Sequence, residues 1–430
     1  MAGYGEWIAL TSLAAILSYS DFGLVTPSVN EIVMAVGAGD IQRARSHLRR
    51  SISAVFLMVT PAVLATAFGL AMIDYRARLH FEFIDNASCT IVIVASAWNI
   101  LSRTMRGLFV ATLYANGDYG VAYTCTGVVR ALELGVVAGI VYSLSAPPAI
   151  VAAVSAAFAS VDLVAIGAFS LRRVAWASLL PEPLTASWLR RLGRPALGFA
   201  LSNTTTQLVM VMGPRIALGV LSGGAAVALY ALYATMMRLV DQCVLIFLQP
   251  LEIEMAHSAG RGDRTKVAQL VAIGAHASWA VFATIVGGLA IIGPYLFPIW
   301  THGQIAFDYG IFAFGGLMFG CNQLGRVCAQ TLIATNRMYG PSARMMAWSL
   351  IAIAVGSGLT VRFGVRGMFC GGIIGELGLS LIATVAVARW LGLPIARLLF
   401  DIGWSRDAAR LLLSWARQRA PKVLAQDRDA

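Results

Sequence analysis

Long hydrophobic runs alternate with short polar connections along most of this chain. A helix that crosses a membrane needs about 20 predominantly apolar residues, and eleven stretches meet this requirement. They are roughly 8–27, 51–73, 88–114, 121–143, 149–171, 196–220, 225–250, 270–298, 305–335, 345–363 and 368–393. The pattern therefore predicts an all-α polytopic membrane protein, with boundaries good to about four residues.

One polar motif occurs twice between these runs. The first copy contains Pro27, Glu31, Gly37, Gly39-Asp40 and Arg43, and the second contains Pro250, Glu254, Gly260, Gly262-Asp263 and Lys266. Each pair is 223 residues apart (250 − 27, 263 − 40). Two ungapped copies indicate a duplication, with each copy forming a tight elbow between two membrane helices. Six predicted spans separate the copies, so the repeats should run parallel, related by a pseudo-two-fold axis along the membrane normal.

The duplication predicts two parallel helix-bundle lobes. We expect an N-terminal lobe at 1–171, a cytoplasmic linker at 172–195, a C-terminal lobe at 196–393 and a basic amphipathic cytoplasmic tail at 394–430. The lobes hold five and six spans, because the first has no counterpart of the span at 196–220. Either that helix was lost or the natural start lies upstream of Met1, and the repeat favours the upstream start. Arginines alternate with Leu and Trp in the tail, which is typical of a helix anchored in the membrane interface.

Composition and charge agree with this class. Hydrophobic residues make up 58% of the chain and charged residues 12%, against about 25% charged residues in soluble domains. Most arginines and lysines lie in alternating connections, at 37–50, 172–195, 251–269 and 336–344, which the positive-inside rule makes cytoplasmic. The net charge of +11 thus reflects topology in a plasma (inner) membrane protein, not nucleic-acid binding. Arg362 and Arg366 lie on the external side, against the rule.

Ionisable residues also fall inside the predicted spans, where each costs about 3 kcal/mol on insertion scales. The basic ones are Arg103, Arg106, Arg130, Arg215, Arg238 and Arg326, and the acidic ones are Asp21, Glu133, Asp162, Asp241 and Glu376. At about 1.5 Å per residue, all the arginines except Arg215 lie about 13–18 Å from the cytoplasmic ends of their spans. The spacing places Arg103 and Arg106 on one helix face with Asn99.

A guanidinium fork suits the oxygens of phosphate and pyrophosphate. If the arginine faces converge, they form a cationic cavity for a phosphate-bearing anion. Local neutralisation is the alternative: Arg130 with Glu133, and Arg238 with Asp241, are pairs spaced i, i+3, and Arg215 or Arg326 could instead bind carbonyl groups. Asp21, Asp241 and Glu376 are candidates for ion coupling. Glu31 and Glu254 are candidates for a gate with Arg43 or Lys266, or for capping a helix end.

Several segments resemble a known family. They are Tyr4-Gly5-x-Trp7, Ser20-Asp21-Phe22-Gly23-Leu24, the elbow from Glu31 to Gly39-Asp40, Arg215-Ile-Ala-Leu-Gly219 and Ala226-Val-Ala-Leu-Tyr230-Ala. Together they resemble the polysaccharide-repeat-unit (O-antigen) flippases of the multidrug/oligosaccharidyl-lipid/polysaccharide exporter superfamily, over nearly the whole chain. The resemblance implies two lobes of six spans, alternating access, a cationic central cavity and an undecaprenyl-pyrophosphate-linked oligosaccharide as cargo. This chain departs from that pattern in lacking the first span.

We therefore expect a flippase, not an enzyme, that needs no cofactor and no metal. Its expected partners are the lipid-linked anionic oligosaccharide, membrane lipids and glycan polymerase or assembly proteins, and the chain itself is expected to be a monomer. Two alternatives remain open. One is a cation-coupled drug or metabolite antiporter of the same fold, which typically relies on buried carboxylates. The other is a membrane glycan polymerase or glycosyltransferase, which generally needs a large external loop or an acidic catalytic motif.

Overall fold

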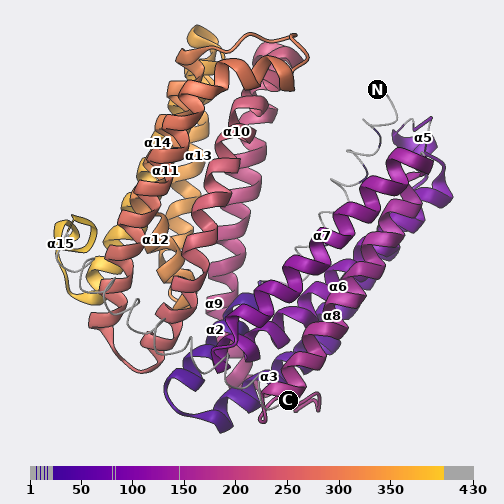
Figure 1. Ribbon diagram of the computed structural model, residues 1–430, viewed down its shortest axis with the longest axis vertical. Coiled ribbons are helices and arrows are strands. Elements are labelled where there is room, and N and C mark those ends of the chain that lie inside the picture. Colours follow the sequence, from indigo (N-terminus) through magenta and orange to yellow (C-terminus); the bar gives the residue numbers. More distant parts are fainter. Residues whose placement is uncertain are drawn as a thin grey trace, which may run out of the picture. The chain divides into compact units, whose positions relative to one another are not determined.

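In the computed structural model, the described part of the chain forms helices and no strand (Figure 1). The structure describes residues 23–79, 81–82, 84–144 and 146–400, together with positions 6, 10, 14 and 17. Most of the predicted span 8–27, including Asp21, and most of the predicted tail 394–430 lie outside these residues. By its contacts the chain divides into two compact units, Met1–Ala200 and Leu201–Ala430.

The first unit is built around α6, α7 and α8, which run side by side (Figure 1). Phe109, Leu113, Ala122 and Ile166 form the core where these three helices meet. Helix α6 also packs against α2 and α4, and a π-helical turn joins α3 to α4. The helices are α2 (Val25–Gly37), α3 (Ile41–Ala54), η2 (Val55–Val59), α4 (Thr60–Ala71), α5 (Tyr75–Leu79), α6 (Asn86–Asn116), α7 (Tyr119–Leu144), α8 (Pro148–Arg173) and the start of α9 (Ala186–Thr204).

The second unit repeats this order of long helices. Helix α14 packs against α12 and α13, while α10 packs against α11 and α12. An aromatic core fills the space between them, in which the ring of Tyr230 packs at a tilt against Phe369 and that of Tyr233 against Phe297. The helices are η3 (Thr205–Met212), α10 (Gly213–Gly260), α11 (Arg264–Trp300), α12 (Tyr309–Ala334), α13 (Tyr339–Phe363), α14 (Val365–Leu391) and α15 (Ile395–Phe400).

Seven helical stretches among the described residues are long and apolar enough to cross a membrane. The stretch Ala186–Gly260 has 75 residues, or about 110 Å at 1.5 Å per residue, well over the ~30 Å of a hydrocarbon core. Gly223, with φ 79° and ψ 178°, breaks it, so it contains the two predicted spans 196–220 and 225–250. Helices α6 and α12 are also long enough, but their arginine and amide side chains lower their hydropathy. The predicted all-α polytopic class is confirmed.

The two elbows have the same backbone. Gly39 and Gly262 both take a left-handed conformation, with φ of 79° and 77°, which glycine adopts without steric cost. The next residue caps the following helix in each case: Asp40 Oδ1 accepts from the Arg43 amide, and Asp263 Oδ1 from the Lys266 amide, both at 2.9 Å. The repeat seen in the sequence therefore extends to individual hydrogen bonds.

The segment at 172–195, which was predicted to be a linker, is partly helical. Helix α9 begins at Ala186, ten residues before the predicted span at 196. Residues before α9 pack on α3, where Glu182 accepts from Arg50 Nη2 at 2.7 Å and Ser46 Oγ at 3.0 Å. Burial raises the pKa of Glu182, but these hydrogen bonds outweigh it and hold that pKa below its ordinary value. The segment is thus attached to the first unit by side-chain contacts.

Arg366, which the sequence reading placed on the external side, forms a local ion pair. Arg366 Nη2 lies 2.9 Å from Asp308 Oδ2, and Asp308 also accepts from the amides of Gly310 and Ile311 at the start of α12. Burial raises the pKa of Asp308. The hydrogen bonds that Asp308 accepts from Ile311, Arg366 and Gly310 lower this pKa by more, so the net pKa is below the ordinary value. Arg366 therefore carries little unbalanced positive charge on that side.

Replacing either elbow aspartate with alanine is expected to lower the free energy of unfolding by about 1 kcal/mol, because an amide in the first turn loses its acceptor. Since the elbows have the same geometry, Asp40→Ala and Asp263→Ala should lower the apparent Tm of the solubilised protein by similar amounts. Asp→Asn at each site retains an acceptor and serves as the control. A shift at only one elbow would contradict their equivalence.

Candidate functional site

The membrane helices of the first unit bring together charged side chains from α6, α7 and α8. Arg106 Nε lies 2.6 Å from Asp162 Oδ2 on α8, and Arg106 Nη2 donates to Thr126 Oγ1 on α7. Only 4% of the Asp162 side chain is exposed, so the carboxylate depends on this partner. Asn99, on the same face of α6 as the spacing predicts, donates to the Ser155 carbonyl of α8 at 3.4 Å. Arg106 is therefore paired across helices.

Arg103 lies in the same cluster without a partner of its own. It is exposed, and no described residue forms an ion pair or hydrogen bond with it. Its charged neighbours are Arg130, Glu133, Arg106 and Asp162. Arg130 Nη1 pairs with Glu133 Oε2 at 2.8 Å, as their i, i+3 spacing predicted. With all groups ionised, three arginines face two carboxylates, which leaves one excess positive charge.

A second cluster occupies α10, α12 and α14 in the other unit. Arg326 Nη1 lies 2.7 Å from Asp241 Oδ1 on α10 and donates to Asn322 Oδ1 at 2.9 Å. The amide of Asn322 in turn donates to Glu376 Oε2 on α14 at 2.7 Å. Gln323 reaches Asp241 at 3.5 Å. Two carboxylates, two amides and one guanidinium thus form a continuous hydrogen-bonded chain across three helices.

The local pair of Arg238 with Asp241, one of the alternatives left open by the sequence, does not form among the described residues. The carboxylate of Asp241 faces α12, where it forms an ion pair with Arg326. Arg238 forms no ion pair among the described residues. Its charged neighbours are Arg215 and Asp241. The Nε of Arg215 is buried without a hydrogen-bond acceptor. This cluster also contains three arginines and two carboxylates, and here two of the arginines form no ion pair with any residue that the structure describes.

Close helix packing fixes the position of the second cluster. A Cβ on Gly325 would overlap the backbone of Ser380, so only glycine allows α12 and α14 to approach this closely. Ser380 Oγ donates to the Cys321 carbonyl at 2.8 Å at the same level. Because Arg326 and Glu376 flank this contact, their separation is set by backbone packing.

The sequence reasoning missed Asn322 and Gln323 and assigned no partner to Asp162. An amide pair inside an apolar run, four and three residues before Arg326, is the signal that identifies the first two. The partner of Asp162 follows only from the helix packing, since Arg106 lies 56 residues away (162 − 106).

The elbow carboxylates make contacts within their own elbows. Glu31 Oε2 lies 3.0 Å from Arg43 Nη2, 3.3 Å from Arg191 Nη2 and 3.7 Å from His47 Nε2. Among the described residues, Glu254 forms an ion pair with Lys266 alone. Both carboxylates therefore join the two helices of an elbow, and in the first elbow Arg191 adds the start of α9.

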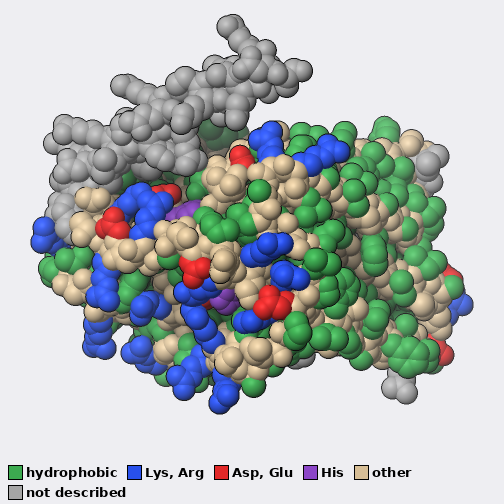
Figure 2. Space-filling view, turned by 90° about the horizontal axis from the view of Figure 1, so that it is seen from below, with side chains coloured by type: hydrophobic (Ala, Val, Ile, Leu, Met, Phe, Trp, Pro, Cys, Tyr) green, Lys and Arg blue, Asp and Glu red, His purple; other side chains and the backbone are tan. Residues whose placement is uncertain are grey.

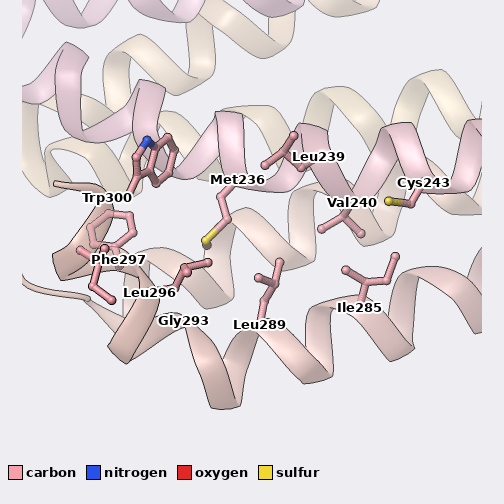
Figure 3. A pocket seen from close by; sticks show the side chains of 11 residues that line it. Met236, Leu239, Val240, Cys243, Ile285, Leu289, Gly293, Leu296, Phe297 and Trp300 are labelled. Carbon is pink, nitrogen blue, oxygen red and sulfur yellow. The ribbon is translucent and has the colours of Figure 1, made fainter. Parts of the chain in front are cut away.

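An apolar pocket of about 450 Å³ lies between α10 and α11 (Figure 3). Its wall contains no charged side chain, so the pocket is chemically separate from the arginine cluster. A pocket of this kind accepts a hydrocarbon group. The residues around it are Met236, Leu239, Val240, Cys243, Ile285, Leu289, Gly293, Leu296, Phe297, Ile299 and Trp300.

No protein-family model matches this chain, and no curated protein does. Solved structures nevertheless share its fold. The Vibrio cholerae MATE transporter VcmN in its bent form is 18% identical, over 93% of this chain and 90% of that one, with a TM-score of 0.71. An outward-facing multidrug resistance MATE family transporter of the MOP superfamily is 14% identical, over 93% and 89%, with a TM-score of 0.69. At these identities the similarity establishes the fold alone.

Removing Asp162 should leave the guanidinium of Arg106 without its counter-charge in a low-dielectric site. Asp162→Ala is expected to cost about 3–5 kcal/mol of unfolding free energy. The double variant Arg106→Met/Asp162→Leu removes both charges and should recover most of this loss, as measured by thermal unfolding in detergent. An Asp162→Ala variant as stable as the parent would contradict the ion pair.

Proposed function

We propose that this protein is an exporter of an anionic, phosphate-bearing lipid, most specifically an undecaprenyl-pyrophosphate-linked oligosaccharide, which it moves across the inner membrane by alternating access. The observation that carries the proposal is the charge of the two clusters. Each contains three arginines and two carboxylates on membrane helices, where a charge costs about 3 kcal/mol. Neutralisation alone does not account for the third arginine, and an anionic cargo does.

The arginines have two different roles in this proposal. Among the described residues, Arg103 in the first cluster and Arg215 and Arg238 in the second form no ion pair, and we assign them to the cargo. Arg106 and Arg326 are held in place by Asp162 and Asp241. A guanidinium group binds two phosphate oxygens at once, so either cluster by itself offers a group that suits a phosphate of the cargo.

The fold supports a conformational cycle. The similar structures include MATE transporters in bent and outward-facing conformations, as their descriptions state. A cycle of this kind exposes one site to the two membrane faces in turn. Export of an anion is favoured by an inside-negative potential, by about 2.3 kcal/mol per charge per 100 mV.

The carboxylates couple this cycle to an ion in our proposal. Glu376 and Asp241 lie at the two ends of the hydrogen-bonded chain through Asn322 and Arg326, so a cation or proton at either end alters the contacts at the other. Asp21 lies outside the described residues and remains a candidate from the sequence. Glu31 and Glu254 act as gates when their ion pairs with Arg43 and Lys266 break and free the two helices of each elbow. The cargo would be handed to a glycan polymerase or assembly protein.

Arg103→Ala is expected to reduce transport of the lipid-linked oligosaccharide at least tenfold, because a charge-assisted hydrogen bond contributes about 1.5–3 kcal/mol. Transport is measured in proteoliposomes as the exposure of a labelled pyrophosphate-linked lipid at the outer leaflet. Arg45→Ala removes the same charge from an exposed position on α3 and is the control. Unchanged transport by Arg103→Ala would exclude the proposed role.

A cation-coupled drug or metabolite antiporter is the second candidate, and the carboxylates favour it. Asp162 and Glu376 are buried, and one similar structure is described as a multidrug resistance transporter. If this candidate is right, Glu376→Gln should abolish efflux of a cationic dye while Arg103→Ala leaves it intact. If the flippase proposal is right, neither variant changes dye efflux, because the parent protein has none. The measurement is dye accumulation in cells that express each variant.

A further inference from the structure

The first elbow contains a cavity that is separate from both arginine clusters. It has a volume of about 260 Å³ and lies between α3 and the start of α9. Figure 2 shows the molecule from below, which is the end at which α2 and α3 are labelled in Figure 1. On this face Lys and Arg side chains gather, and histidine side chains lie among them. The cavity is lined by Arg43, Ser46, His47, Arg50, Ser187, Trp188 and Arg191.

The three arginines of this cavity retain unused donors. Arg43 and Arg191 each direct one terminal nitrogen to Glu31, and Arg50 directs one to Glu182. The Nε atoms of Arg43 and Arg50 are buried without a hydrogen-bond acceptor. Three guanidinium groups thus face two carboxylates, and donors remain for an anion with several oxygens.

Trp188 and His47 fix the shape of the cavity. Trp188 Nε1 donates to His47 Nδ1 at 3.1 Å, and both side chains are buried. Because Nδ1 accepts, the neutral imidazole carries its proton on Nε2, on the side of Glu31. This bond joins α3 to α9 across 141 residues and holds the basic side chains of the two helices face to face.

The second elbow provides an internal comparison. Adding 223 to the numbers of the α3 residues gives Lys266, Gln269, Leu270 and Ile273 in place of Arg43, Ser46, His47 and Arg50. The second copy therefore retains the elbow backbone and the residue that pairs with its glutamate, but loses the other basic positions. There α15 packs against α11, with Leu398 fully buried. The cavity is consequently a property of the first copy and not a requirement of the elbow fold.

We propose that this cavity binds the phosphate group of an anionic ligand. Its volume lies below the ~300–1,000 Å³ of sites for drug-sized ligands, which fits a head group or a small anion. Forked guanidinium donors and serine hydroxyl groups suit phosphate oxygens. Such a group also competes with Glu31 for Arg43 and Arg191, so its binding loosens the contacts between α2, α3 and α9.

A phosphate group of this kind has two sources, a phospholipid head group and a free anion. Binding is therefore measured on the full-length protein in nanodiscs with inorganic pyrophosphate as the probe. The discs contain phosphatidylcholine alone or phosphatidylcholine with phosphatidylglycerol. Saturable pyrophosphate binding that phosphatidylglycerol does not weaken identifies a free anion as the ligand. Binding that phosphatidylglycerol displaces identifies a lipid head group.

The variants Arg50→Gln and Arg191→Gln should weaken pyrophosphate binding by about tenfold each, the equivalent of one charge-assisted hydrogen bond. Arg45→Gln and Arg190→Gln change the same charge on the same two helices but do not line the cavity, and they should bind as the parent does. Ser187→Phe fills the cavity without removing a charge and should also abolish pyrophosphate binding. This variant tests the proposal even if an arginine variant does not fold.

The proposal is overturned if pyrophosphate and phosphatidylglycerol both fail to bind, or if the cavity variants bind as tightly as their controls. It is independent of the proposed function. Arg103 does not line the cavity, so in an Arg103→Ala background the cavity variants should still bind pyrophosphate more weakly than their controls. Either proposal can therefore fail without the other.

Discussion

The cost of placing a guanidinium group among apolar helices governs the arrangement of this protein. A buried arginine needs a counter-charge or a set of acceptors, and the packing of the helices supplies one. Arg106 joins α6 to α8 through Asp162, and Arg326 joins α12 to α10 through Asp241. Further arginines lie near both pairs, Arg103 and Arg130 in the first unit and Arg238 in the second. Arg106 and Arg326 therefore join helices, while the proposed cargo would bind the arginines that form no ion pair with a described residue.

The duplication preserved backbone geometry more strictly than side-chain chemistry. The elbows agree in their left-handed glycines and in their capping aspartates. The clusters reach the same balance of charge by different routes. The first takes its buried acid from α8, while the second takes it from α10 and adds Asn322 as a bridge to Glu376. Local turns tolerate few substitutions, whereas a counter-charge can come from any neighbouring helix.

This difference explains what could be predicted from the sequence. Hydrophobic runs predicted the spans, and repeat spacing predicted the elbows, because both depend on residues close together in the chain. The pair formed by Arg130 and Glu133 followed for the same reason. The spacing of Arg238 and Asp241 was equally suitable, yet Asp241 pairs with a residue 85 positions away, Arg326 (326 − 241), which the sequence alone could not indicate. The elbow cavity depends on α9, whose amphipathic start carries too many arginines to be recognised as part of a span.

Pairing with a carboxylate does not remove an arginine from anion binding. A guanidinium group has five N–H donors in one plane. Arg106 forms an ion pair with Asp162 through Nε, which makes no hydrogen bond, and donates from Nη2 to Thr126, so Nη1 remains. Arg326 uses Nη1 for both Asp241 and Asn322, while its Nε is buried without an acceptor. A lysine ammonium in the same position would be a point charge with three donors on a single atom. The choice of arginine at these membrane positions thus combines a structural ion pair with donors directed elsewhere, and a phosphate group, with several oxygens, is the anion that uses such donors best.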